Sequence, residues 1–124
     1  MRCKEIVNNI INKYNNEYKF LPTASELVYS LPKVNMIILS SERIKNPNNF
    51  FAFSILHEIG HIKTYKKEHT SATKEYLATQ WAINENVNWN IPVNDDEKKI
   101  WQEYIYSYTK EKDKSKYLLD WSAM

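Results

Sequence analysis

Apolar residues recur at intervals of three and four along several stretches of the chain, which is typical of one face of a helix. The first such stretch covers residues 4–16. A shorter helix is predicted over residues 23–30, because Thr23 and Glu26 stand at the spacing of a capping box. Pro32 is expected to end it, since a proline pushes the preceding residue out of the helical region.

A different pattern predicts a small sheet. Residues 34–39 (Val-Asn-Met-Ile-Ile-Leu) form a short apolar run with branched side chains, followed by two serines. Such a run between polar residues indicates a strand. A second strand is predicted around residues 18–21.

Three longer helices are predicted in the rest of the chain. Residues 50–66 are apolar on nearly all sides, which indicates a buried central helix. Further helices are expected over residues 71–88 and from Asn94, which forms a capping-box pattern with Glu97, to about residue 110. The fold class predicted is α+β, with four to five helices and a short sheet of two to three strands.

The end of the chain is expected to divide into two parts. Residues 111–116 carry mixed charge and are expected to be solvated. The apolar residues between Tyr117 and Trp121 are expected to dock on the core. No repeat or linker interrupts the pattern, so residues 1–124 are interpreted as one domain.

Composition limits the class of protein. The chain has 124 residues, 43% of them hydrophobic and 14% aromatic, which suffices for one core. Seventeen Lys and Arg against fifteen Asp and Glu give a net charge of only +2, so we expect no direct nucleic-acid binding. No run approaches the roughly 18 apolar residues of a membrane span. A single glycine favours a helix-rich fold.

The remaining compositional features bear on location. Cys3 is the only cysteine and cannot form an internal disulfide, so we expect a reducing cytoplasm. No apolar signal-peptide core follows the first residues. Abundant Lys, Asn, Ile and Tyr, which have AT-rich codons, favour a low-GC bacterial or phage genome.

The sequence His57-Glu58-Ile59-Gly60-His61 has the form HExxH and lies inside the predicted central helix. Four residues are slightly more than one helical turn, so both imidazoles project from one face and can meet one metal ion. Glu58 lies about 100° round the helix from His57. There it can accept a proton from zinc-bound water, whose pKa the metal lowers to about 7. The alternative is an accidental match, with both histidines as ordinary polar residues.

A catalytic zinc site needs a third protein ligand and an open position. Thr64 and Lys67 stand where a metzincin would carry glycine and histidine, which excludes that class. Glu75 is the favoured third ligand, because it shares a helical stripe with Ala78, whose small side chain permits close helix packing. The alternatives are His69 as the ligand, and Glu75 as a solvent-facing acid in the first turn of its helix.

The HEIGH sequence is followed by E-x-x-A-x-x-aromatic-Ala and preceded by a short strand and a helix start rich in Asn and Phe. In these features the chain resembles the ImmA/IrrE family of metallopeptidases over about residues 34–83. The resemblance implies a small zincin-like domain in which His57, His61 and Glu75 bind one Zn²⁺ per chain and Glu58 is the catalytic base.

The family is common in phages and other mobile elements. Its characterised members cleave a helix-turn-helix repressor encoded nearby, so the resemblance implies a protein substrate of this kind. Two departures are visible. The interval of 14 residues from His61 to Glu75 is shorter than in many members. The additional domain of some larger relatives is missing, so their substrate choice does not carry over.

Other residues are candidates for supporting roles. Tyr65, His69 or Tyr104 could donate a hydrogen bond to the oxyanion of a tetrahedral intermediate. The strand at 34–39 could pair with an extended substrate if it lies at a sheet edge beside the site. Three lysines are expected to form the solvated end of the central helix, and four tryptophans to lie in the core: Lys63, Lys66 and Lys67, and Trp81, Trp89, Trp101 and Trp121.

The sequence therefore predicts a zinc metalloendopeptidase that hydrolyses a peptide bond by Glu58-assisted attack of zinc-bound water. Its substrate is expected to be a specific protein, such as a phage or mobile-element repressor. One alternative is a non-catalytic zinc-binding regulator that acts by binding its partner. The other is a helical interaction protein without a metal. The sequence does not determine the cleavage site, the activating signal or the oligomeric state.

Overall fold

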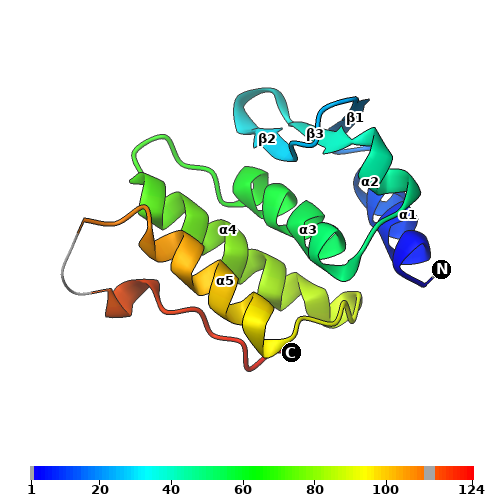
Figure 1. The fold of residues 1–124 in the computed structure, drawn as a ribbon. Helices are drawn as coiled ribbons and strands as arrows, with labels where there is room; N and C mark the ends of the chain where they lie inside the picture. Colours follow the sequence, from blue (N-terminus) through cyan, green and yellow to red (C-terminus); the bar gives the residue numbers. More distant parts are fainter. Residues whose placement is uncertain (1, 111–113) are drawn as a thin grey trace.

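A computed structural model describes residues 2–110 and 114–124, and this part of the chain forms five α-helices and one three-stranded sheet (Figure 1). The α+β class is confirmed, with the expected number of helices and strands. The elements, in order, are α1 (Arg2–Tyr14), β1 (Lys19–Thr23), β2 (Tyr29–Leu31), β3 (Met36–Ser40), α2 (Ser41–Lys45), α3 (Asn49–Lys63), α4 (Ser71–Glu85) and α5 (Asp95–Tyr106). Short 3₁₀ turns cover Pro32–Val34, Asn86–Asn88 and Ser115–Tyr117.

The sheet has the order β1-β3-β2, with β3 parallel to β1 and antiparallel to β2. The strand predicted at 34–39 is β3, which begins two residues later because Asn35 adopts a left-handed conformation with φ of 52°. Since β3 is paired on both sides, the hypothesis that it could take a substrate strand is wrong. The strand predicted at 18–21 is confirmed as β1.

No helix forms over residues 23–30, so that prediction is wrong. The Thr23 hydroxyl accepts a hydrogen bond from the backbone N–H of Ser25, and the Ser25 hydroxyl accepts one from Leu27. Such local side-chain bonds stabilise turns at the expense of a helix. The segment therefore bends from β1 into β2, which the sequence pattern did not indicate.

The other helices are close to their predicted positions. Asn48 caps α3 by accepting a hydrogen bond from the N–H of Phe51, and the helix ends at Lys63, three residues earlier than expected. The last three residues of the helix predicted at 71–88 form a 3₁₀ turn instead. The capping box of Asn94 and Glu97 is confirmed at the start of α5, which ends at Tyr106 rather than near 110. The short helix α2 was not predicted.

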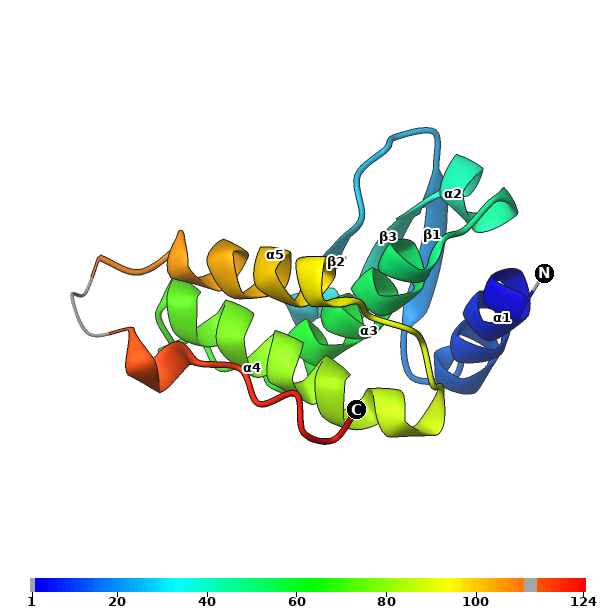
Figure 2. The same ribbon diagram turned by 60° about the horizontal axis from the view of Figure 1, so that its bottom comes forward.

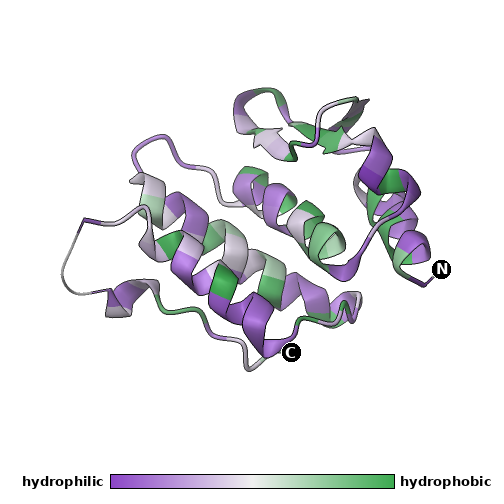
Figure 3. Cartoon of the chain, in the orientation of Figure 1, coloured by the Kyte–Doolittle hydropathy of each residue, from purple (hydrophilic) through white to green (hydrophobic). Residues whose placement is uncertain are grey.

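The central helix α3 lies between the sheet and the pair α4 and α5 (Figures 1 and 2). Its buried apolar side chains join those of β3, α1, α4 and α5 in one core, and Figure 3 shows hydrophobic residues in each of these elements. Among the tryptophans, Trp101 is buried, whereas the other three are partly buried against the core. None of the described helices combines the length and apolar character that crossing a bilayer requires.

The C-terminal segment docks on α4 and α5, as predicted, with Tyr117 and Leu119 buried. The Gln102 side chain donates a hydrogen bond to the Tyr117 carbonyl and accepts one from the Leu119 N–H, both at 2.8 Å. Gln80 makes the same pair of bonds with the backbone of Asp120, at 2.9 Å. Of the segment expected to be solvated, residues 111–113 lie outside the described residues, and residues 114–116 are exposed.

The only glycine of the chain, Gly60, lies on α3 in close contact with the backbone of α4 at Ala78. A Cβ atom at this position would lie 2.3 Å from the backbone oxygen of Ala78. Real Cβ atoms essentially never come so close to backbone, so any side chain here must push the two helices apart. Ala78 itself is fully buried in this contact. Two small residues therefore set the separation of the helices.

We predict that Gly60→Ala lowers the free energy of unfolding by about 3 kcal/mol, because the added methyl group overlaps a backbone carbonyl that cannot move alone. Urea denaturation followed by circular dichroism measures the change. The control is Ser54→Ala in the same helix, which removes only a hydroxyl bonded to the Phe50 carbonyl and should cost about 1 kcal/mol or less. Equal stability of Gly60→Ala and the wild type would contradict the contact.

Candidate metal centre

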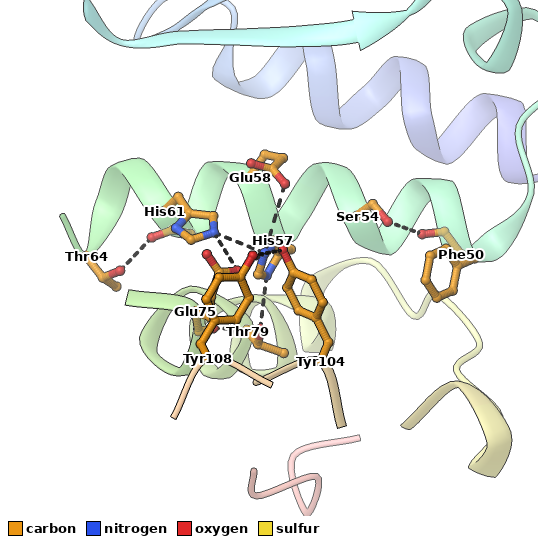
Figure 4. A network of polar contacts seen from close by, with 11 residues as sticks. Phe50, Ser54, His57, Glu58, His61, Thr64, Glu75, Thr79, Tyr104 and Tyr108 are labelled. Atoms are coloured by element: carbon orange, nitrogen blue, oxygen red, sulfur yellow. Dashed lines mark hydrogen bonds and ion pairs between the residues drawn. The ribbon is translucent and has the colours of Figure 1, made fainter. Parts of the chain in front are cut away.

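The two histidines of the HExxH sequence and Glu75 converge between α3 and α4 (Figure 4). The Nε2 atoms of His57 and His61 are 3.1 Å apart. Oε1 of Glu75 lies 3.2 Å from Nε2 of His57 and 3.1 Å from Nε2 of His61. In the part of the chain that the structure describes, no other group of histidine, cysteine and acidic side chains meets in this way. The three donor atoms form a nearly equilateral triangle.

This triangle fits a tetrahedral metal ion. Nitrogen and oxygen ligands lie about 2.0–2.1 Å from zinc, which places two tetrahedral ligands about 3.3 Å from each other. The observed separations of 3.1–3.2 Å are close to that value. A divalent ion can therefore be held by these three side chains with small movements.

Glu75 does not face solvent, so the alternative interpretation of this residue as an exposed acid is wrong. Its side chain is only 14% exposed, and it lies in the second turn of α4, which begins at Ser71. Burial alone would raise the pKa of Glu75, but hydrogen bonds to His57 and His61 outweigh burial and hold that pKa at about 2. Glu75 is therefore anionic at neutral pH, the form in which a carboxylate binds a metal.

The same contacts affect His61. Burial lowers the pKa of its imidazole, whereas the hydrogen bond and the charge of Glu75 raise it, and the net direction is upward. A metal ion would compete with that proton, because only the neutral imidazole has a free lone pair for it.

The Thr79 hydroxyl determines which nitrogen of His57 is free. This hydroxyl lies 2.8 Å from the Glu75 carbonyl oxygen and 3.0 Å from Nδ1 of His57. A carbonyl oxygen can only accept, so the single hydroxyl proton of Thr79 goes to Glu75. The hydroxyl oxygen must then accept a proton from His57, which places hydrogen on Nδ1. With Nδ1 engaged by Thr79, Nε2 of His57 is the nitrogen that faces the triangle, and it can bind a metal ion once it gives up the hydrogen that it shares with Glu75.

Glu58 lies beside the triangle without belonging to it. Its Oε2 atom is 4.0 Å from Nε2 of His57, and its side chain is 13% exposed. Figure 4 shows its carboxylate on a different side of α3 from the group formed by His57, His61 and Glu75. The carboxylate therefore lies near the centre and remains accessible from an open cleft.

This cleft has a volume of about 370 Å³ and separates β2 from α4 and α5. Glu58, His61 and Glu75 lie on it, together with residues of the two rims: Tyr29, Ser30 and Pro32 on one side, and Lys74, Tyr104 and Tyr108 on the other. Because β2 is hydrogen-bonded only to β3 within the described chain, it is the strand with an unpaired edge near the centre.

The oxyanion candidates are placed differently. Tyr65 and Tyr104 both line the cleft, whereas His69 does not, and its buried Nδ1 has no partner among the described residues. Burial, the neighbouring Tyr108 hydroxyl and the charge of Glu75 raise the pKa of Tyr104. Tyr104 therefore keeps its proton and can donate it in a hydrogen bond.

The three lysines agree with their prediction. Lys63 is exposed at the last residue of α3, and Lys66 and Lys67 are exposed beyond it. Lys63 also pairs with Glu17, with 2.9 Å between Nζ and Oε2. This ion pair connects α3 to the segment that follows α1.

The sequence pattern did not identify two residues of the site, Thr79 and Tyr108. Thr79 stands four residues after Glu75, on the same helical face, and Tyr108 stands four residues after Tyr104. This spacing was visible, but nothing in it indicates which face meets the histidines. The hydroxyls of Tyr104 and Tyr108 lie 3.0 Å apart.

We predict that Thr79→Val weakens zinc binding at least tenfold, because the Nδ1–H of His57 loses its acceptor and the ring its orientation. Affinity is measured by competition with a chromogenic chelator. Thr79→Ser, which keeps the hydroxyl, should bind zinc like the wild type. The ¹⁵N shifts of the zinc-loaded protein report which ring nitrogen binds the metal, and zinc on Nδ1 of His57 in the wild type would contradict this assignment.

Comparisons of the chain with family models, with curated proteins and with solved structures gave no match. What the protein does is therefore inferred from its own residues. These are two imidazoles and a carboxylate that meet in one triangle, with a second carboxylate beside them in an open cleft.

Proposed function

We propose that this chain is a zinc metalloendopeptidase of the ImmA/IrrE type, acting on a protein substrate in the reducing cytoplasm of a bacterium. The observation that carries the proposal is the position of Glu58. Its carboxylate is 4.0 Å from a candidate ligand atom yet outside the ligand triangle, facing a cleft. A purely structural zinc has four protein ligands and no use for a neighbouring base.

The chemistry divides between the ion and the chain. Bound zinc supplies a Lewis acid that lowers the pKa of water and polarises the peptide carbonyl. Glu58 accepts a proton from the attacking water and passes it to the nitrogen of the leaving amine. Tyr104, neutral and at the cleft, donates a hydrogen bond to the carbonyl oxygen of the substrate as negative charge develops there.

The rims of the cleft support a polypeptide as substrate. Exposed aromatic side chains line both sides of it: Tyr29 on β2, and Tyr104 and Tyr108 on or just after α5. Exposed aromatic and apolar side chains at a cleft are typical of sites of protein interaction. A helix-turn-helix repressor encoded near this gene is the first substrate to test, on the strength of the family resemblance.

We predict that the purified protein carries about one zinc ion per chain and that Glu75→Ala carries far less, because two imidazoles alone leave the ion short of a ligand. Inductively coupled plasma mass spectrometry measures the content. Glu68→Ala, which removes an exposed acid between the same helices, is the matched control and should retain zinc. Equal zinc in Glu75→Ala and the wild type would exclude Glu75 as the third ligand and make His69 the next candidate.

We predict that Glu58→Gln keeps its zinc but cleaves at least about a hundredfold more slowly, because the amide cannot accept the proton of the attacking water. The probes are the neighbouring repressor and a proteome-derived peptide library, with new amino termini identified by mass spectrometry. Undiminished cleavage by Glu58→Gln would overturn the mechanism. Absence of cleavage by the zinc-loaded wild type would favour the non-catalytic regulator.

A further inference from the structure

A second hollow, of about 220 Å³, lies beside the candidate centre and is not used by the chemistry described above. It is bounded mainly by apolar side chains from three parts of the chain: Val28 before β2, Phe50 in α3, and Ile100 and Trp101 in α5. His57 and Glu58 also line it, so one wall is shared with the centre. We call it the apolar pocket.

The walls of the apolar pocket are held in place by aromatic packing. The rings of Phe50 and Trp101 are stacked with 5.3 Å between their centroids, and Phe53 packs edge-on against Trp101 at 5.4 Å. Trp101 is 6% exposed and therefore anchored in the core. Ile100 in the same helix is 52% exposed, which leaves a large aliphatic side chain at the mouth. The pocket is thus pre-formed, with an apolar wall opposite the polar one that Ser54, His57, Glu58 and Tyr104 provide.

Size and chemistry indicate what can occupy it. A cavity of about 150 Å³ lined by Leu, Ile and Phe binds benzene, so this pocket has room for a side chain of leucine or phenylalanine size. Among the described residues that line it, none carries a positive charge, and Glu58 would repel an acidic side chain. A charged side chain would also lose hydration among these walls without a full set of partners.

The wall that the pocket shares with the candidate centre determines which residue of a bound peptide can place its side chain in the pocket. Successive residues of an extended chain advance about 3.3 Å. Because His57 and Glu58 contact both the centre and the pocket, a side chain in the pocket belongs to a residue directly beside the bond that is cut.

We propose that the apolar pocket binds a large apolar side chain, such as leucine, methionine or phenylalanine, of a substrate residue that flanks the scissile bond. This inference rests on the proposed peptidase function for its position relative to the bond. It gives the protein selectivity for substrates that present a large apolar residue beside the bond that is cut.

The first experiment measures binding without cleavage. The full-length protein is titrated with N-acetyl-leucinamide, N-acetyl-serinamide and N-acetyl-lysinamide while the indole N–H signal of Trp101 is followed by NMR. The leucine compound should saturate the shift at a concentration at least tenfold lower than the other two. Ile100→Lys should abolish that preference. Val87→Lys, which changes an equally exposed aliphatic residue outside the pocket, should preserve it.

The second experiment compares the residues flanking the bonds cut in the peptide library by wild type, Ile100→Lys and Val87→Lys. In the wild type, large apolar residues should be enriched at one position that flanks the cut bond. This enrichment should be at least tenfold lower for Ile100→Lys and unchanged for Val87→Lys. Leucine-selective binding without any cleavage would support the pocket and refute the peptidase. Cleavage without apolar enrichment, or equal binding of the leucine and lysine compounds, would overturn the pocket.

Discussion

The close approach of α3 to α4 at Gly60 and Ala78 is the constraint on which the candidate centre depends. With no side chain on Gly60, the two helices come near enough for Glu75, one turn before Ala78, to reach both histidines. A wider separation would leave the carboxylate beyond hydrogen-bonding distance of the imidazoles. The single glycine of the chain therefore acts through distance, not through backbone conformation, since its φ lies outside the left-handed region.

Burying polar groups in this position has a cost that the local network offsets. His57 is 3% exposed and lies among apolar side chains of α3 and α5, yet both of its ring nitrogens have partners. The Thr79 hydroxyl satisfies one nitrogen, while His61 and Glu75 meet the other. A buried network in which each member is satisfied specifies one arrangement of its side chains. The centre is thus both rigid and chemically poised for an ion.

How much of this could be predicted from sequence depends on how local each feature is. The spacing of His57 and His61 is a property of one helix, so their shared face followed from the sequence alone. Glu75 followed from helical phase plus the small size of Ala78, because only the crossing of two neighbouring helices was needed. The contact of Thr79 with His57 and the position of Tyr104 at the cleft depend on the rotation of α4 and α5 about their axes relative to α3. A local sequence pattern does not determine that rotation. A local pattern can also mislead. The capping-box spacing of Thr23 and Glu26 predicted a helix over residues 23–30, but Thr23 and Ser25 form turn hydrogen bonds there instead.

The location of all three candidate ligands within residues 57–75 has a consequence for the order of folding. Closing a short loop loses little chain entropy, and pairs of neighbouring helices form faster than sheets that join distant segments. The α3–α4 hairpin can therefore assemble before β1 and β3 pair in parallel. A metal ion held by these three side chains would stabilise the hairpin by itself, independently of the sheet.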